Sequence, residues 1–128
     1  MIIILAILYQ LTFKQIEMVK DTPIEFKVFY EERPTYSGLY DGEKIEIFVG
    51  GYSKERGIEV WIPYVIKNTI PHEMGHIIYQ KIRTYETDKE LVDNFKNQED
   101  YKKLSEKFEK YESIDLPAEI YANKFNLK

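Results

Sequence analysis

Both histidines of this 128-residue chain lie in one short stretch, "PHEMGH". His72 and His76 are four residues apart, and Glu73 stands between them. On a helix, residues four apart lie on nearly the same face, one turn from each other. Two imidazoles placed in this way can bind a single tetrahedral zinc ion. The spacing therefore predicts a metal site on a helix, although a pair of histidines on an ordinary helix would show the same spacing.

Glu73 follows His72 directly, so its side chain points about 100° around the helix from that imidazole. It is poorly placed to be a third ligand, but it can reach a water molecule bound to the same metal. Such a water ionises far more readily than bulk water, and a nearby carboxylate can take its proton. This is the chemistry of the H-E-x-x-H motif. We therefore predict Glu73 to be a general base and acid.

A catalytic zinc needs a third protein ligand. The chain has no cysteine and no other histidine, so this ligand must be Asp or Glu. Most acidic residues lie in charged runs, but Glu119 lies in the apolar stretch "LPAEIYANKF". It follows Asp115, a predicted helix N-cap, and Pro117, which suits a first turn. We predict Glu119 to be the third ligand of one zinc per chain; the alternative is a first-turn glutamate favoured by the helix dipole.

Asn123 lies four residues after Glu119, on the same face of the predicted helix. A metal-bound imidazole usually donates its other N–H group to a nearby acceptor. We predict that the amide of Asn123 supplies this acceptor to His72 or His76.

The first half of the chain shows the alternation of apolar and polar residues that is typical of strands. Asp41-Gly42 is a strong hairpin signal, and the stretch 50–57 suits a loop or a second hairpin connection. The predicted strands are a short edge strand over 35–40 and three longer strands over 24–30, 44–50 and 57–63.

The second half is helical in its apolar spacing. Because proline fits only a first turn or a kink, Pro71 predicts a helix that begins a few residues before His72 and ends near Arg83. The charged stretch 86–112 predicts one or two amphipathic helices, and a last helix begins near Asp115. The fold expected is α+β, in a single domain over 1–128, with a small mixed sheet mainly in 1–63 and helices mainly in 64–128.

The composition of the chain limits the classes of partner and the location that we expect for it. A net charge of −4 and a pI near 5.3 argue against nucleic acid as a partner. The apolar run Ile2–Leu8 is far shorter than the roughly 18 residues of a membrane helix, so it predicts a buried element and no membrane insertion. It also lacks the flanks of a signal peptide, from which we expect a cytoplasmic protein. The high content of Lys, Glu and Ile is typical of thermophilic proteins.

His-Glu-Met-Gly-His at 72–76 and the later Glu-Ile-Tyr-Ala-Asn at 119–123 resemble the pattern of the gluzincins. In these zinc metallopeptidases an H-E-x-x-H helix is paired with a glutamate helix. The form E-x-x-A-[D/N], the preceding strands and the short chain resemble most the minigluzincins, small soluble relatives of the catalytic domains of integral-membrane metallopeptidases. The resemblance covers about residues 24–125 in architecture. It implies that His72, His76 and Glu119 bind zinc and that Glu73 is the general base.

The resemblance further implies a sheet packed on the active-site helix and an edge strand, in 35–40 or in 58–62, that binds an extended peptide. Asn123 stands where many relatives have Asp, which weakens the expected hydrogen bond. Minigluzincins are held latent by C-terminal segments. We therefore expect that the long charged helices cover the cleft or pack on a second subunit, and that a homodimer would form through them or through the C-terminal segment.

Two alternatives stay open. The string E-x-x-A-N-x-F, which Phe125 completes, also occurs in ImmA/IrrE-type regulatory metallopeptidases, but the chain shows no convincing DNA-binding helix-turn-helix. The second alternative is a non-catalytic assembly module with a structural metal. A structural zinc normally has four protein ligands, so a fourth side chain that closes the site would favour this alternative.

Overall fold

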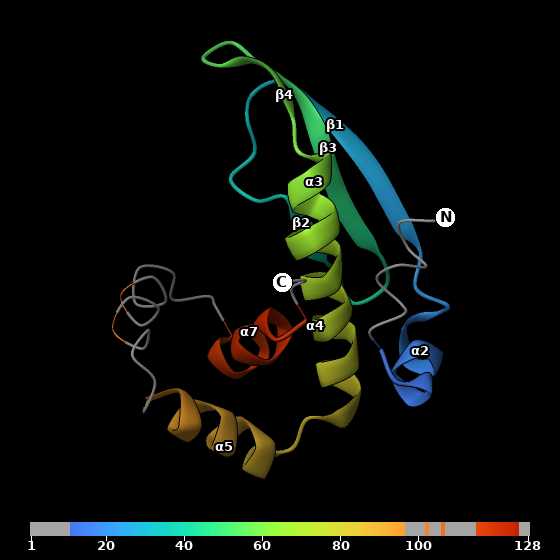
Figure 1. Ribbon diagram of the computed structural model, residues 1–128, viewed down its shortest axis with the longest axis vertical. Coiled ribbons are helices and arrows are strands. Elements are labelled where there is room, and N and C mark those ends of the chain that lie inside the picture. Colours follow the sequence, from blue (N-terminus) through green and yellow to red (C-terminus); the bar gives the residue numbers. More distant parts are fainter. Residues whose placement is uncertain (1–10, 97–101, 103–105, 107–114, 126–128) are drawn as a thin grey trace.

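The fold is α+β, as predicted, with a small mixed sheet beside one long helical segment (Figure 1). The computed structural model describes residues 11–96, 102, 106 and 115–125. The predicted N-terminal element over Ile2–Leu8 and most of the charged stretch after Lys96 lie outside these residues. None of the described helices is long and apolar enough to cross a membrane.

Strand β3 is the centre of the sheet. It pairs in parallel with β1 on one side, and on the other side it pairs antiparallel with β2 and then, further along, with β4. The β1–β3 register shifts at a bulge between Lys27 and Val28. The four strands are β1 (Ile24–Glu31), β2 (Gly38–Tyr40), β3 (Ile45–Ser53) and β4 (Gly57–Val60).

The strand predictions hold at β1, β2 and the Asp41-Gly42 turn, where Gly42 adopts the positive φ of 98° that glycine allows. The stretch 50–57 is a hairpin connection whose first residues still belong to β3. The predicted strand over 57–63 was too long, because β4 ends at Val60. Pro63 lies in the first turn of the short helix α3 (Ile62–Tyr64), where its missing N–H group costs nothing.

The helix that carries the two histidines is confirmed where it was predicted, because α4 (Ile70–Ile82) begins two residues before His72 and ends next to Arg83. Helix α3 continues through a π-helical stretch, η1 (Val65–Thr69), into α4 (Ile70–Ile82). Pro71 lies in the first turn of α4, as predicted, but no pattern in the sequence predicted the helical stretch that precedes it. The wider π turn directly precedes Pro71, which has no N–H group to donate to the carbonyl four residues earlier.

Helix α4 buries its apolar face against the sheet and against helix α2 (Phe13–Val19). Strand β2 lies very close to this helical segment. A Cβ atom on Gly38 would collide with the Thr69 side chain. The hydroxyl groups of Ser37 and Thr69 are 2.7 Å apart at the same crossing. The core that results contains residues 0–7% exposed: Leu11, Val19, Ile45, Ile47, Val65, Ile70, Met74, Ile77 and Ile78.

Helix α7 (Leu116–Asn123) packs across α4, and helix α5 (Tyr85–Lys96) packs on α7 (Figure 1). The N-cap prediction is confirmed, because the Asp115 side chain accepts a hydrogen bond from the backbone N–H group of Ala118. At the crossing, a Cβ atom on Gly75 would lie 2.8 Å from the Cα atom of Ala122. Gly75 therefore allows the two helices to approach more closely than any side chain would.

This contact leads to a stability prediction. Replacing Gly75 by Val should lower the free energy of unfolding by about 1–3 kcal/mol, because the added carbons overfill the α4–α7 contact. The loss should appear in urea unfolding, despite the better helix propensity of Val. The control is Gln80→Val, an exposed position of the same helix, which should change stability by about 0.5 kcal/mol at most. Equal stability of Gly75→Val and the parent chain would contradict the packing argument.

Candidate metal centre

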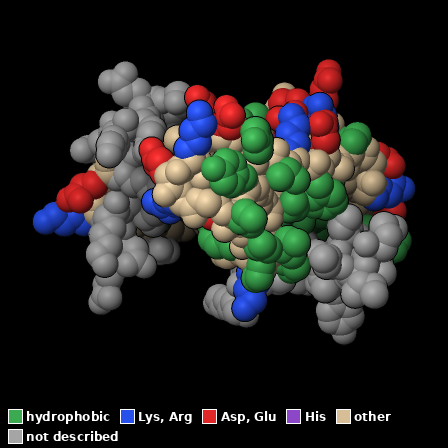
Figure 2. All heavy atoms as spheres, turned by 90° about the horizontal axis from the view of Figure 1, so that it is seen from above, with side chains coloured by type: hydrophobic (Ala, Val, Ile, Leu, Met, Phe, Trp, Pro, Cys, Tyr) green, Lys and Arg blue, Asp and Glu red, His purple; other side chains and the backbone are tan. Residues whose placement is uncertain are grey.

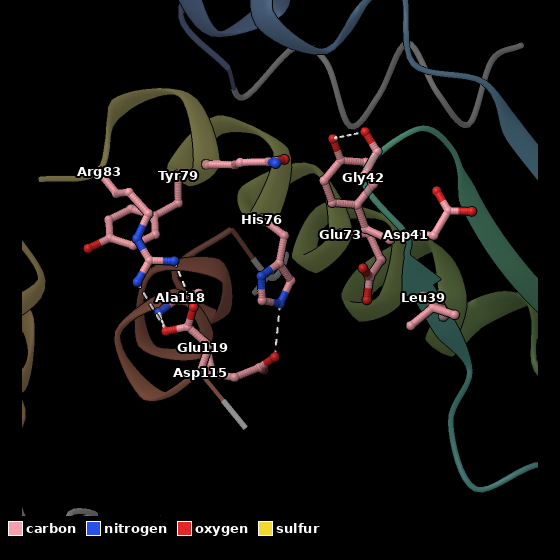
Figure 3. A pocket seen from close by; sticks show the side chains of 13 residues that line it. Leu39, Asp41, Gly42, Glu73, His76, Tyr79, Arg83, Asp115, Ala118 and Glu119 are labelled. Carbon is pink, nitrogen blue, oxygen red and sulfur yellow. Dashed lines mark hydrogen bonds and ion pairs between the residues drawn. The ribbon is translucent and has the colours of Figure 1, made fainter. Parts of the chain in front are cut away.

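The three predicted ligands meet between α4 and α7. His72 and His76 lie one turn apart on α4, and Glu119 points at them from the first turn of α7. Their Nε2 atoms lie 3.0 Å and 2.9 Å, respectively, from the two carboxylate oxygens of Glu119 (Figure 3 shows the His76 contact). The two Nε2 atoms are 3.1 Å apart. The structure thus brings together His76 and a glutamate that follows it by 43 positions in the chain.

These ligand atoms fit a tetrahedral ion. With metal–ligand bonds of about 2.0–2.1 Å, neighbouring ligand atoms of a tetrahedral zinc lie about 3.3 Å apart. The distances here are a few tenths of an ångström shorter, so a small outward rotation of the side chains would admit the ion. Among the described residues, this is the one group of three potential ligands whose atoms all lie within 4.8 Å of one another.

Charge favours a cation at this place. Burial tends to raise the pKa of Glu119, but the hydrogen bonds to His72 and His76 outweigh it and lower the pKa to about 2. Burial tends to lower the pKa of His76, but the hydrogen bond and the charge of Glu119 outweigh it, so this pKa is raised. Glu119 is therefore ionised at neutral pH and offers an anionic ligand, as a divalent metal requires.

Glu73 lies beside this group rather than in it. Its side chain is only 7% exposed, and it points from α4 toward β2 (Figure 3). Burial raises its pKa, an effect that the two histidines and the backbone of Tyr40 partly offset. A carboxylate with a raised pKa beside a metal site is suited to take up a proton near neutral pH. Its role as base stays a prediction.

A cavity of about 490 Å³ joins these residues to the edge of the sheet. Gly38, Leu39 and Tyr40 of β2 form one wall, and α4 and the first turn of α7 form the others. Glu73, His76 and Glu119 open into it, whereas no described residue of β4 or α5 lines it. The substrate-sized space therefore lies between β2 and the candidate metal centre.

The outer edge of β2 faces this cavity. Ser37 accepts a hydrogen bond from Phe48, and Asp41 donates one to Lys44, so these alternate residues face β3. Antiparallel pairing alternates between the two edges of a strand. The backbone groups of Gly38 and Tyr40 therefore point away from β3.

Arg83 was not predicted as a site residue, but it caps the C-terminal end of α4 and lines the cavity. Its guanidinium group donates to both carboxylate oxygens of Asp115, at 2.6 Å and 3.2 Å, and to Asp88 of α5 at 2.9 Å. These bonds tie the start of α7 to the end of α4, one turn before Glu119. The only signal in the sequence for this ion pair is that Asp115 and Arg83 were both predicted at helix ends.

The position of Asn123 supports its predicted role less well than the positions of His72, His76 and Glu119 support theirs. It is the last residue of α7, its side chain is exposed, and it forms no hydrogen bond to His72 or His76 in the part of the chain that the structure describes. Its role beside the histidines stays a prediction.

Comparisons with protein-family models, with curated proteins and with solved structures found no match for this chain. The function of this chain is therefore inferred from the geometry of the site.

The Arg83 contact gives a prediction on metal affinity. Arg83→Ala should weaken zinc binding about two- to fivefold, because Glu119 is less firmly positioned and a partly exposed ion pair contributes modestly. Titration calorimetry against a competing chelator measures this. The control is Arg56→Ala, which removes an arginine paired with Glu59 on the β3–β4 hairpin and should leave the affinity unchanged. Equal affinities for the two variants would show that the Arg83 bonds do not position Glu119.

Proposed function

We propose that this chain is a zinc-dependent metallopeptidase of the minigluzincin type, a cytoplasmic protein that hydrolyses peptide bonds within extended segments. The observation that carries the proposal is the meeting of Glu119 with His72 and His76 beside the buried Glu73. The H-E-x-x-H spacing alone can arise on any helix. A glutamate from a separate helix, with both of its oxygens near the two imidazoles, is what a gluzincin site needs.

The number of ligands supports a catalytic rather than a structural metal. Structural zinc sites are closed by four protein ligands, whereas catalytic sites have three and leave a position for water or substrate. The described residues supply three converging ligands, and the cavity reaches two of them, His76 and Glu119. This arrangement favours a peptidase over a metal-stabilised assembly module.

Each residue then has a defined task. His72, His76 and Glu119 would hold zinc, which when bound polarises a carbonyl group and makes a water molecule easier to deprotonate. Glu73 takes the proton of the attacking water and donates it to the leaving amine. Burial of Glu73 raises its pKa, which makes it a stronger base than an exposed glutamate.

Strand β2 is the better of the two predicted substrate edges, since it borders the cavity and β4 does not. An extended peptide would pair with the outward backbone groups of β2 and so add a strand to the sheet. Such a peptide would pass close to Glu73, because Tyr40 of this edge and Glu73 line the same cavity. The substrate class is therefore an unfolded or extended protein segment.

Two substitutions separate metal binding from catalysis. Glu119→Ala should lose most of the zinc, because two imidazoles alone bind it weakly. Glu73→Gln should retain about one zinc per chain and lose activity by about 10²–10⁴-fold, because the proton acceptor is gone. Elemental analysis after dialysis gives the zinc content, and mass spectrometry of a digested unstructured peptide mixture gives the activity.

The control for both is Glu106→Gln, which removes one negative charge at an exposed residue outside the site. It should leave zinc content and activity unchanged. Full zinc content in Glu119→Ala would remove this residue from the site. A zinc-loaded chain that cleaves no peptide faster than Glu73→Gln would overturn the proposed activity while leaving the metal centre intact.

A further inference from the structure

Five apolar side chains are exposed together at the end of the sheet where β4 lies. Their exposed fractions are 83% for Ile58, 76% for Tyr30, 70% for Val28, 69% for Val60 and 40% for Tyr52. They come from three neighbouring strands, β1, β3 and β4. We call these five residues the apolar face.

The strand register puts the five on one side of the sheet. Val28 and Val60 pair with Gly50 from its two sides, and Tyr30 and Ile58 pair in the same way with Tyr52. Residues in register project to the same side of a sheet. The rings of Tyr30 and Tyr52 are 5.6 Å apart. Figure 2, which looks onto this end of the molecule, shows hydrophobic side chains gathered side by side.

The opposite side of the same strands is different. Phe29, between Val28 and Tyr30, is 5% exposed and packs on Trp61, with ring centroids 4.9 Å apart. Glu59, between Ile58 and Val60, pairs with Arg33 at 2.9 Å. At this end, the sheet therefore buries the side that carries Phe29. The other side carries the apolar face, which the described residues leave exposed.

An exposed surface of this kind indicates an interaction. At about 100 Å² of exposed area for each side chain, the apolar face offers roughly 500 Å², near the upper end of the largest patch on a typical monomer. A stable protein–protein interface buries about 800 Å² per partner. The apolar face supplies the centre of such an interface, and the charged turn between β3 and β4 is its polar rim.

Charge indicates the kind of partner. None of the five residues is charged, so two copies of the apolar face meet without repulsion at their centre. The chain as a whole has a net charge of −4, which opposes binding to anionic lipid headgroups. Two sheets can pack face to face about 10 Å apart with their side chains interleaved, so a surface of valine, isoleucine and tyrosine side chains suits a second copy of itself.

We propose that the apolar face is the interface of a symmetric homodimer, in which the sheets of two copies of this chain pack face to face. The contact is isologous: each copy contributes the same five residues. The surface differs from the charged helices and the C-terminal segment through which the sequence suggested a dimer. It also lies apart from the cavity between β2 and α7, so the inference does not depend on the proposed activity.

The first test is the mass of the full chain in solution as a function of concentration. Sedimentation equilibrium should give about twice the chain mass of 15.3 kDa at tens of micromolar. Ile58→Lys should raise the dimer dissociation constant about a hundredfold or more, because each interface then buries two unpaired ammonium groups. Tyr85→Lys is the matched control, since Tyr85 is 80% exposed on α5, and it should leave the constant unchanged. Circular dichroism checks that both variants fold.

The second test uses the absence of cysteine from the chain. Ile58→Cys should give a covalent dimer with a short bismaleimide cross-linker, and Tyr85→Cys should not. A full chain that stays monomeric at about 100 µM, well above the dissociation constants of stable dimers, would overturn the proposal. A dimer that Ile58→Lys leaves intact would do the same.

Three further outcomes would also overturn the proposal and would show what occupies the face instead. Binding of the chain to phosphatidylcholine vesicles, lost in Ile58→Lys, would assign the apolar face to a lipid surface. A monomeric Ile58→Cys variant whose introduced thiol resists labelling by a soluble maleimide would assign it to another segment of the same chain. A monomeric Ile58→Cys variant whose thiol labels freely would leave the face without a partner.

Discussion

The packing of α7 across α4 is the contact on which the candidate site depends. A metal centre of this type needs ligands from two helices, and the third ligand contributes only if the helices approach closely enough. Gly75 permits that approach, because a Cβ atom there would meet the backbone of α7. The Arg83–Asp115 bonds fix the other end of the crossing. Between these two points Glu119 has little freedom, and its carboxylate faces both imidazoles.

A second constraint sets the environment of Glu73. Strand β2 passes so close to the helical segment that a Cβ atom on Gly38 would collide with the Thr69 side chain of η1 and lie 3.3 Å from the Glu73 side chain. The same crossing therefore buries the carboxylate and leaves an open strand edge beside it. The environment of the proposed general base and the surface on which we expect the substrate to lie are consequences of one contact.

The two ends of the sheet have different surroundings. Its proximal part, with Ile45 and Ile47, packs on α4 and is the core of the molecule. Its distal part extends beyond that helix and exposes the apolar face. A small domain buries a limited share of its surface, so a sheet longer than the helix that covers it gains stability when a second copy completes the burial. The proposed dimer and the proposed active site would then use opposite ends of one sheet.

Much of the local structure could be predicted from the sequence. Alternating residues predicted β1 and β3, Asp41-Gly42 predicted the hairpin, and Asp115 with Pro117 predicted the start of α7. These features depend on neighbours in the chain, where period and cap chemistry suffice. Local reasoning also placed Pro71 in the first turn of α4, but it did not predict the π-helical stretch that precedes this helix.

The residues of the candidate site were also named from the sequence, because the H-E-x-x-H spacing and the apolar setting of Glu119 are local signals. Only the tertiary structure decided that Glu119 reaches both histidines, that β2 rather than β4 borders the cavity, and that Arg83 joins α4 to α7. It also left Asn123 exposed and, among the described residues, unbonded to the histidines. These facts depend on the approach of segments far apart in the chain, which is set by packing volume and backbone contact, and no spacing in a single sequence encodes them directly.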